Sequence, residues 1–265
     1  MKQKILTYLP ENHPWRDSIH CYKSVTSTND LAKEMAKQGA PAGTVLIAEH
    51  QTGGRGRLGR SFHSPADMGI YLSAILRPNC KANNLMHLTC AAAVAMCDAV
   101  DNALGIRPGI KWTNDLVWNS RKIGGILTEL GIDPATGMID YAIVGIGLNC
   151  HQRPEDFPPE ILSFAGSLDM ASGKPICREA VCAEMIRSLE SMNSKLLCPE
   201  LFMDAYRKSC ITLGREISIL RPEDVHHGKA LDIDEAGGLI VAFPDGHLET
   251  VSSGEVSIRG MYGYV

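Results

Sequence analysis

Apolar residues recur at helical spacing in one long segment of the chain, residues 84–104. The apolar positions lie three or four residues apart, as on one face of a helix: Leu85, Leu88, Ala92, Ala95, Ala99 and Ala103. This period predicts a core helix. A shorter helix is predicted over residues 30–38, because cap-type residues precede it and Gly39 follows it. Two further helices are expected, over about 178–197 and 199–213.

Short apolar runs bounded by turn residues predict a sheet. Two runs, 44–49 and 70–76, precede the long helix, and four follow it in close succession, at 109–112, 115–118, 122–130 and 141–148. Short turns join the last four, so these strands are expected to pair antiparallel. A mixed, largely antiparallel sheet with packed helices is an α+β fold.

After Gly214 the pattern changes to short β-runs only. They lie at 216–220, 228–233, 239–243 and 248–252, each bounded by Gly, Pro or Asp. Strands at this spacing are typical of a small barrel. We therefore expect two domains, residues 1–214 and residues 215–265, the second a small β-barrel.

Composition and charge narrow the class of protein. A chain of 265 residues can bury one large core and a second small one. Its formal charge of −4 argues against a broad nucleic-acid face, so no nucleic-acid partner is expected. No run approaches the roughly 20 apolar residues of a membrane span, and the N-terminus is too polar for a signal peptide. We expect a cytoplasmic protein without a membrane partner.

Cysteine and histidine usage indicates no metal site. The nine cysteines form an odd set without a Cys-x-x-Cys pair, and several lie in apolar helical segments, such as Cys90, Cys97 and Cys182. We interpret them as small buried hydrophobic residues of a reducing compartment. The nine histidines show no metal-ligand spacing, and the pair His226-His227 lies in an expected surface turn.

Residues 53–60 form the segment richest in candidate ligand-binding residues, with four glycines and three arginines in eight positions. Glycine lets the backbone approach a ligand, and guanidinium groups donate in pairs to carboxylate or phosphate. The segment therefore predicts an anion-binding loop. The segment also matches the dinucleotide-binding motif and the P-loop motif, but both motifs must directly precede a helix. A loop and an expected strand follow instead, which excludes both.

Five motifs stand in the order and spacing of the biotin protein ligases, which the chain resembles over nearly its whole length. They are Ser27-Thr28-Asn29, Gln51 with the loop Gly54-Arg-Gly-Arg-Leu-Gly59, Lys111-Trp-Thr-Asn-Asp115, Arg121-Lys-Ile-Gly-Gly-Ile-Leu127 and Gly145-Ile-Gly-Leu-Asn149. The terminal Ser253-Gly-Glu-Val-Ser-Ile258 also resembles that family's C-terminal domain. The resemblance implies a sheet-and-helix ligase domain followed by an SH3-like barrel.

The resemblance implies a reaction in two steps. Biotin and ATP first give biotinyl-5′-adenylate and pyrophosphate, with Mg²⁺, and a lysine of an acceptor protein then attacks the mixed anhydride. The implied acceptor is the biotin carboxyl carrier protein or domain of a carboxylase. Whether the ligase is a monomer or a homodimer is left open.

The resemblance also assigns residues to biotin. The ureido ring presents one acceptor and two donors, which short hydroxyl and amide side chains can satisfy. The matched residues for biotin are Ser27, Thr28, Asn29, Gln51, Gly54, Arg55, Gly56, Arg57, Lys122, Gly145 and Gly147. The two glycines of the last motif would leave room for the biotin tail beside the strand. The hydroxyl and amide residues of the first motif also suit a helix cap, and one residue can serve both purposes.

A second set is implied for ATP and the adenylate. It comprises Arg55, Arg57, Arg60, Phe62, Lys111, Asn114, Asp115, Lys122 and Asn149. Charge that develops during attack on phosphorus must be offset by fixed cations, so Lys122, Arg57 and Lys111 are the expected catalytic residues. Phe62 either stacks over the pocket or anchors the loop. Trp112 and Trp118 are expected in the core.

One position departs from the family pattern, and other functions compete. Thr113 stands where these ligases usually have proline, which leaves the backbone less rigid without requiring different chemistry. A lipoate–protein ligase also activates its substrate as an adenylate. The Gly/Arg loop together with Lys-Trp-x-Asn-Asp favours biotin over lipoate as the substrate. A biotin-responsive repressor would need a DNA-binding domain, for which the first 18 or so residues are too few. A serine hydrolase is disfavoured, because no Gly-x-Ser-x-Gly elbow is present.

Overall fold

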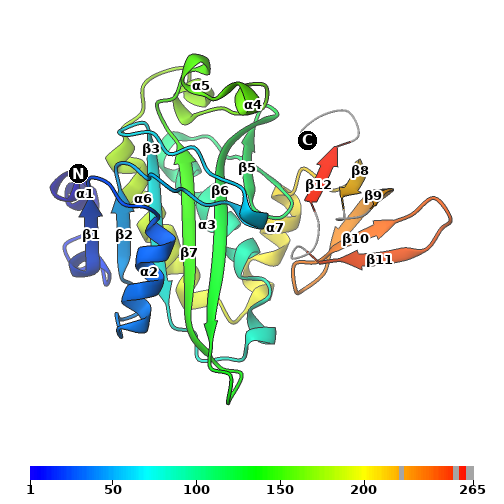
Figure 1. The fold of residues 1–265 in the computed structure, drawn as a ribbon, viewed down its shortest axis with the longest axis horizontal. Helices are drawn as coiled ribbons and strands as arrows, with labels where there is room; N and C mark the ends of the chain where they lie inside the picture. The colour runs from blue at the N-terminus through cyan, green and yellow to red at the C-terminus, as the bar shows by residue number, and fades with distance from the viewer. Residues whose placement is uncertain (221–223, 253–256, 261–265) are drawn as a thin grey trace.

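A computed structural model describes residues 1–220, 224–252 and 257–260 of the chain (Figure 1). Its α-helices are α1 Lys2–Tyr8, α2 Thr28–Lys37, α3 Leu88–Leu104, α4 Pro159–Leu162, α5 Leu168–Ser172, α6 Arg178–Lys195 and α7 Met203–Ser209. The strands of the first sheet are β1 Ile19–Tyr22, β2 Val45–Ala48, β3 Gly69–Leu76, β4 Gly109–Lys111, β5 Asp115–Trp118, β6 Arg121–Ile132 and β7 Ile139–Asn149. The second sheet consists of β8 Glu216–Leu220, β9 Val225–Ile233, β10 Leu239–Ala242, β11 Leu248–Val251 and β12 Ser257–Gly260.

The first sheet is mixed and largely antiparallel, which confirms the predicted α+β class. Its strand order is β1-β2-β3-β7-β6-β5-β4, and β1 pairs with β2 in parallel while the other neighbours are antiparallel. Figure 1 shows α2 in front of the sheet and α3, α6 and α7 behind it. The sheet therefore has two covered faces.

Strand alternation distributes apolar side chains between these two faces. In β2, Val45 and Ile47 join the large core on the side of α3 and α6, whereas Leu46 faces α2. In β7, Val144 belongs to the large core and Ile143 to the cluster under α2. Successive side chains of a strand point to opposite faces, so both cores arise from the same short apolar runs.

Most of the predicted elements are present, but α1, β1, α4, α5 and β12 were not predicted. His226 and His227 lie in β9 rather than in the expected surface turn. The N-terminal α1 and β1 are additional elements, because their few apolar residues show no clear period. The helix expected over 199–213 is shorter and ends at Ser209. Cys210 adopts an extended conformation there, and the backbone N–H of Ile211 donates to the carbonyl of Ile110 in β4 at 2.9 Å. Pairing with the edge of the sheet therefore replaces the last helical turn.

The cysteines are free thiols, and six of the nine are buried. Burial raises the pKa of Cys90 and of Cys97 to about 12, so both remain protonated and unreactive at neutral pH. Cys182 is fully buried in the core of the sheet and α6. These three confirm the interpretation of helical cysteines as small core residues, whereas Cys177 and Cys198 are exposed.

The second sheet is a small antiparallel β domain, as the runs after Gly214 predicted. Its strand order is β11-β10-β9-β8-β12. Of the terminal motif that resembles the ligase C-terminal domain, residues 253–256 lie outside the described residues, and the backbone of Ser257 and Ile258 belongs to β12. The proposed boundary between residues 214 and 215 stays a prediction.

Several contacts join the second sheet to the first part of the chain. Nε of Arg207 in α7 donates to the Ile233 carbonyl at 2.9 Å and lies 3.4 Å from the Asp232 carboxylate. The backbone N–H of Gly214 donates to the carbonyl of Ala230 at 2.8 Å. The indole N–H of Trp112, which is 4% exposed, donates to the carbonyl of Gly237 at 3.0 Å. Trp112 therefore lies in the core, as expected, and couples the end of β4 to a turn of the β domain. None of the described helices is both long and apolar enough to cross a membrane.

The Trp112 hydrogen bond is expected to contribute to stability. Trp112→Phe keeps an aromatic ring but leaves the Gly237 carbonyl without its donor, which should lower the free energy of unfolding by about 1–3 kcal/mol. Urea unfolding measures the loss. Trp15→Phe is the control, because Trp15 is also buried but its indole N–H has no hydrogen-bond partner among the described residues. Equal losses in the two variants would show that ring size, not the hydrogen bond, matters.

Candidate active site

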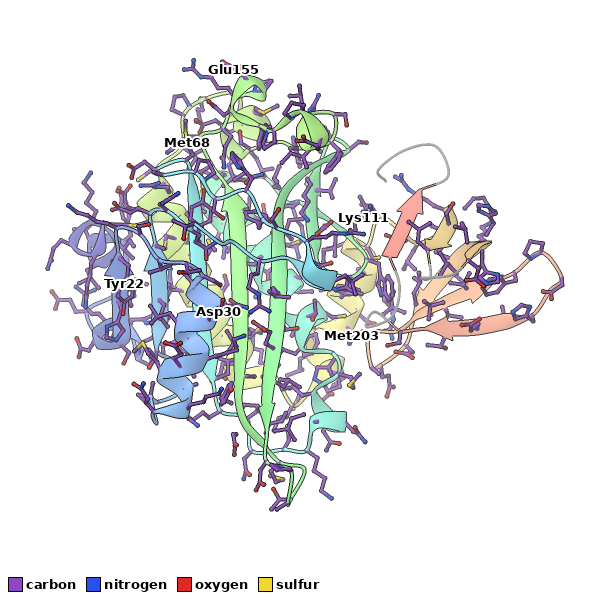
Figure 2. The ribbon with its side chains drawn as sticks, in the orientation of Figure 1. Tyr22, Asp30, Met68, Lys111, Glu155 and Met203 are labelled. Atoms are coloured by element: carbon purple, nitrogen blue, oxygen red, sulfur yellow. The ribbon has the colours of Figure 1, made fainter. Side chains whose placement is uncertain are left out.

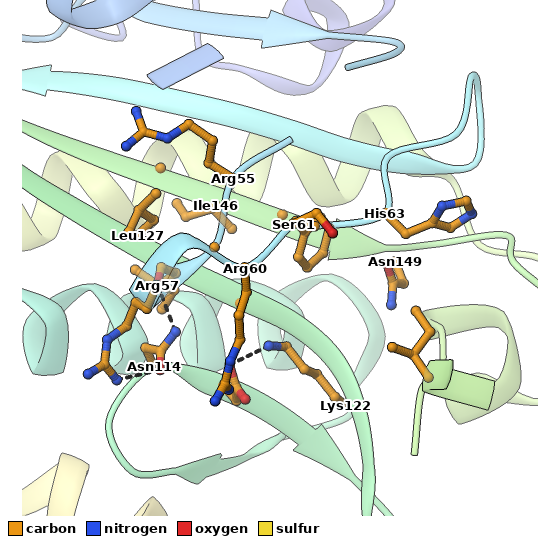
Figure 3. Close-up of a pocket in the computed structure, with 18 of the residues that line it drawn as sticks. Arg55, Arg57, Arg60, Ser61, His63, Asn114, Lys122, Leu127, Ile146 and Asn149 are labelled. Carbon is orange, nitrogen blue, oxygen red and sulfur yellow. Dashed lines mark hydrogen bonds and ion pairs between the residues drawn. The ribbon is translucent and has the colours of Figure 1, made fainter. Parts of the chain in front are cut away.

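A cavity of about 280 Å³ lies on the α2 side of the first sheet (Figure 3). It is lined by sixteen of the predicted residues, namely Ser27, Thr28, Asn29, Gln51, Arg55, Gly56, Arg57, Arg60, Phe62, Lys111, Asn114, Asp115, Lys122, Gly145, Gly147 and Asn149. Figure 2 marks Asp30 on α2 and Lys111 on β4, which lie to the left and to the right of the central strands β7 and β6 in this view. The fold thus brings five separate motifs to one cavity. Gly54 is the predicted residue that does not line it.

The cavity floor is a stretch of sheet in which three of four facing positions are glycine. Gly125 of β6 pairs with Gly147 of β7, and Leu127 pairs with Gly145 in the next position on the same face. Further along β7, Ile143 occupies the equivalent position and packs under α2. The hollow therefore begins where glycines replace apolar residues on one face of β6 and β7.

Protein side chains partly fill the space beside these glycines. A Cβ atom at Gly145 would overlap the Asn29 amide, and one at Gly147 would overlap the Phe62 ring. The Phe62 ring also meets Tyr71 edge-to-face, with 6.5 Å between centroids. This packing supports the anchoring role of Phe62. Contact of either glycine with a biotin tail stays a prediction.

The N-terminus of α2 is capped from two directions. Ser27 is the N-cap residue, and its hydroxyl accepts from the backbone N–H of Asp30. The Gln51 side-chain oxygen accepts from the Thr28 backbone N–H at 2.8 Å and from the Thr28 hydroxyl at 3.1 Å. The Gln51 amide nitrogen donates to the Ser64 hydroxyl at 3.1 Å. Cap groups and the start of the Gly/Arg segment therefore belong to one network.

Asn29 is held in place by groups on two strands, β6 and β3. Its side-chain nitrogen donates to the Leu127 carbonyl and to the Glu129 carboxylate, at 3.2 Å and 2.8 Å. Its oxygen accepts from the Ser73 hydroxyl at 2.6 Å. Ser73 is fully buried, and sequence reasoning missed it. The signal available was a hydroxyl within an otherwise apolar strand run.

The Gly/Arg segment folds as a short hairpin. The Phe62 backbone N–H donates to the Gly54 carbonyl at 2.9 Å, and that of Gly56 donates to the Arg60 carbonyl at 2.7 Å. A Cβ atom at Gly54 would collide with the Phe62 carbonyl, so this position requires glycine. At the tip, Leu58 has a φ of 54°. Gly54 shapes the hairpin rather than lining the cavity.

Arg55 points away from Arg57, Arg60 and Lys122, as Figure 3 shows, and contacts α2 through Asp30. Its guanidinium pairs with the Asp30 carboxylate and lies 3.4 Å from the Glu129 carboxylate. Partial burial acts to raise the pKa of Asp30, but hydrogen bonds from Lys33 and Arg55 outweigh it, and the pKa is lowered. Arg55 thus fastens the hairpin to α2, and its contact with a bound anion stays a prediction.

Positive charge gathers at the other end of the cavity. Besides Arg55, the lining cations are Arg57, Arg60, Lys111 and Lys122, whereas Asp115 is the one lining carboxylate among the described residues. Lys122 Nζ lies 2.6 Å from Asp115 Oδ1. Lys111 is 6% exposed, and burial lowers the pKa of Arg57. A surplus of positive charge in a partly buried cavity favours a polyanionic ligand.

An apolar wall completes the cavity, and sequence reasoning missed it. It consists of Phe157, Ile161, Phe164 and Ala165, from the segment around α4. The Lys122 backbone N–H donates to the Phe164 carbonyl at 2.6 Å, which ties the wall to β6. The available signal was a run of apolar residues and prolines just after the last motif.

Asn149 supports this wall. Its side-chain nitrogen donates to the Gly166 carbonyl at 2.9 Å, and its oxygen accepts from Gln152 at 3.3 Å. The Asn149 amide therefore joins the end of β7 to the segment after α4. Its contact with an adenylate stays a prediction. Within the part of the chain that the structure describes, no group of three or more His, Cys, Asp or Glu side chains is placed to hold a metal ion.

Comparisons with known proteins agree with this geometry. Residues 21–149 match the biotin/lipoate A/B protein ligase family, and residues 212–259 match the biotin protein ligase C-terminal domain. The bifunctional ligase/repressor BirA of Bacillus subtilis is 34% identical over 239 residues, covering 88% of this chain and 72% of that protein. The biotin–[acetyl-CoA-carboxylase] ligase of Mycobacterium tuberculosis is 32% identical over 250 residues, covering 91% and 89%.

The fold is also that of solved ligases. The biotin protein ligase of Aquifex aeolicus, in complex with biotin and ATP, superimposes with a TM-score of 0.76 at 29% identity, covering 91% of this chain and 98% of that one. Fold and cavity thus define the class of biotin and lipoate ligases. Within that class, the chain belongs to the biotin protein ligase family.

Replacement of Gly145 should disturb the cavity more than replacement of a nearby glycine. In Gly145→Ala the new methyl group overlaps Asn29, which is 4% exposed and hydrogen-bonded on all sides, so overpacking should cost about 1–3 kcal/mol of unfolding free energy. In the control Gly125→Ala, the methyl group meets only the flexible end of Lys122 and the Asp115 carboxylate, at 3.3 Å and 3.5 Å. Urea unfolding compares them. A Gly145→Ala protein as stable as the control would contradict this packing.

Proposed function

We propose that this chain activates biotin with ATP to biotinyl-5′-adenylate and transfers the biotin to a lysine of a biotin carboxyl carrier protein. The supporting observation is one cavity that joins short polar groups at the start of α2 to a cluster of cations, of which Lys111 is buried. Such a cavity suits a ligand with a small polar ring at one end and an anion at the other. The membership of the biotin protein ligase family supports the same reaction.

The ureido ring of biotin is proposed to bind at the start of α2. Ser27 and Thr28 carry hydroxyl groups there, and Gln51 and Asn29 carry amides. All four are tied into the cap network or to the strands, so their positions exist before a ligand arrives. Preorganised donors and acceptors cost little ordering on binding. The tail of biotin would then run along Gly145 and Gly147 toward the cations.

The biotin carboxylate and the α-phosphate are proposed to meet among Arg57, Lys111 and Lys122. The carboxylate oxygen attacks the α-phosphorus, a new P–O bond forms, and the bond to the departing pyrophosphate breaks. Negative charge gathers on the phosphate oxygens during this step, and fixed cations offset it without reorganisation. We infer that Arg60, at the exposed end of the hairpin, contacts the triphosphate.

The adenine base is proposed to lie against the apolar wall of Phe157, Ile161 and Phe164. A flat aromatic base gains from contact with apolar and aromatic side chains. In the second step, the amine of the acceptor lysine attacks the biotinyl carbonyl carbon, and AMP leaves with the electrons of the broken C–O bond. The same cations would stabilise the departing phosphate.

Mg²⁺ is proposed to arrive with ATP. Asp115 is the one carboxylate among the described lining residues, and it is paired with Lys122. A single paired carboxylate fits a cation that keeps mostly phosphate and water ligands, as Mg²⁺ does with nucleotides. Bound there, the ion would neutralise part of the triphosphate charge. We further propose that residues 1–214 form the catalytic domain and residues 215–265 the C-terminal domain, and that the enzyme acts in the cytoplasm.

A transfer assay tests the proposed function. The protein is incubated with labelled biotin, MgATP and a biotin carrier domain, and the label is expected on one lysine of the carrier. A parallel reaction with lipoate should give little or no transfer, because the ureido contacts have no partner in lipoate. A known biotin protein ligase serves as positive control. Failure to label a carrier that the control labels would exclude the proposal, and preferential lipoate transfer would reassign the substrate.

Lys122→Ala should impair adenylate formation far more than biotin binding. Its ammonium group lies among the cations at the phosphate end, so its loss should slow pyrophosphate release about 10²–10³-fold. Biotin affinity, measured by isothermal titration, should change little. Lys37→Ala, at the end of α2 outside the cavity, is the control. Collapse of biotin affinity with an unchanged rate at saturation would show that Lys122 acts at the biotin end.

A further inference from the structure

Thr113 makes a contact that the proline expected at this position could not make. The Thr113 hydroxyl lies 3.2 Å from Nη1 of Arg57, in position to accept its N–H. The same Nη1 lies 3.1 Å from the side-chain oxygen of Asn114. Two adjacent residues therefore offer two acceptors to one guanidinium. Thr113 is 3% exposed, so its hydroxyl is largely shielded from competing water.

The two acceptors are themselves fixed. The buried Tyr206 hydroxyl donates to the Thr113 carbonyl at 3.1 Å, which anchors the segment to α7. The Asn114 side-chain nitrogen donates to the Ile126 carbonyl at 2.9 Å, and the Ile126 backbone N–H donates to the Asn114 carbonyl at 3.0 Å. Contacts with α7 on one side and with β6 on the other thus fix the positions of Thr113 and Asn114.

Arg57 needs such fixed acceptors, because its side chain projects from a hairpin whose tip is exposed at Leu58 and Arg60. It lies in the hairpin between Gly56 and the tip residues Leu58 and Gly59, both of which have positive φ. A long arginine side chain on such a hairpin has many rotamers to lose when it is held in one direction. Acceptors on a rigid neighbouring segment select one of them before a ligand binds.

We propose that Thr113 is a positioning residue whose hydroxyl, together with Asn114, aims the Arg57 guanidinium at the anionic end of the cavity. The inference rests on the proposed adenylate-forming function and deepens it. The Thr113 hydroxyl supplies Arg57 with an acceptor in addition to the Asn114 side-chain oxygen. Thr113 acts through Arg57 and need not touch the substrate.

Two substitutions separate the hydroxyl from the shape of the side chain. Thr113→Val removes the hydroxyl and keeps the branched shape, whereas Thr113→Ser keeps the hydroxyl. Thr113→Val should slow biotin-dependent ATP–pyrophosphate exchange by about 10-fold or more, because it removes a hydrogen bond from a charged donor. Thr113→Ser should retain most of the rate. Biotin affinity by isothermal titration should stay unchanged in both, because the cap network binds the other end.

A double-mutant cycle tests the coupling to Arg57. In an Arg57→Ala background, Thr113→Val should cause little further loss, since the group that it positions is absent. Unfolding midpoints of all variants check that each is folded. Equal loss in Thr113→Val and Thr113→Ser, or the same loss with and without Arg57, would overturn the positioning role. Wild-type protein without any biotin-dependent exchange would overturn the proposed function as well, whereas active wild type with an equally active Thr113→Val would overturn this inference alone.

Discussion

The pairing of β6 with β7 is the constraint on which the cavity depends. In this register Gly125 faces Gly147 and Leu127 faces Gly145, so Leu127 is the one side chain on this face of the two strands over two successive pairs. The opposite face of the same strands carries Ile126, Val144 and Ile146 into the large core. A slip of one residue would move every side chain to the other face, burying the glycines in the core and filling the hollow. Core packing and cavity shape are thus decided by one register.

Two kinds of interaction hold the cavity walls in place: hydrogen bonds shielded from water at the start of α2, and a solvent-exposed ion pair between the hairpin and α2. The network of Gln51, Thr28, Asn29 and Ser73 consists of buried neutral hydrogen bonds, each of which is costly to leave unmade. The pairing of Arg55 with Asp30 is about two-fifths exposed on both sides and is screened by solvent. The start of α2 is therefore the rigid part of the site. The hairpin above it is fastened by weaker, exposed contacts, which suits a segment that a substrate must pass.

Local sequence determined much of this protein. Apolar runs bounded by turn residues specify the strands β2 to β11, because their patterns depend on near neighbours in the chain. Ser27 before a helical pattern specifies the cap of α2, and the crowding of glycine and arginine in residues 53–60 marks a ligand loop. The order of the five motifs identifies the family. Each motif and each strand run lies within about ten consecutive residues, and the order of the motifs can be followed along the chain without knowledge of which residues contact each other.

Tertiary structure alone decided which side chains meet. Arg55 and Arg57 are two residues apart, yet one pairs with Asp30 on α2 and the other with Thr113 and Asn114 beside β5. Nothing near Ser73 in sequence indicates that its hydroxyl would hold Asn29, 44 residues away. The apolar wall after β7 likewise has no ligand motif of its own. These partners are set by strand order and register, which bring distant segments together, whereas sequence patterns report only the conformation that each segment prefers by itself.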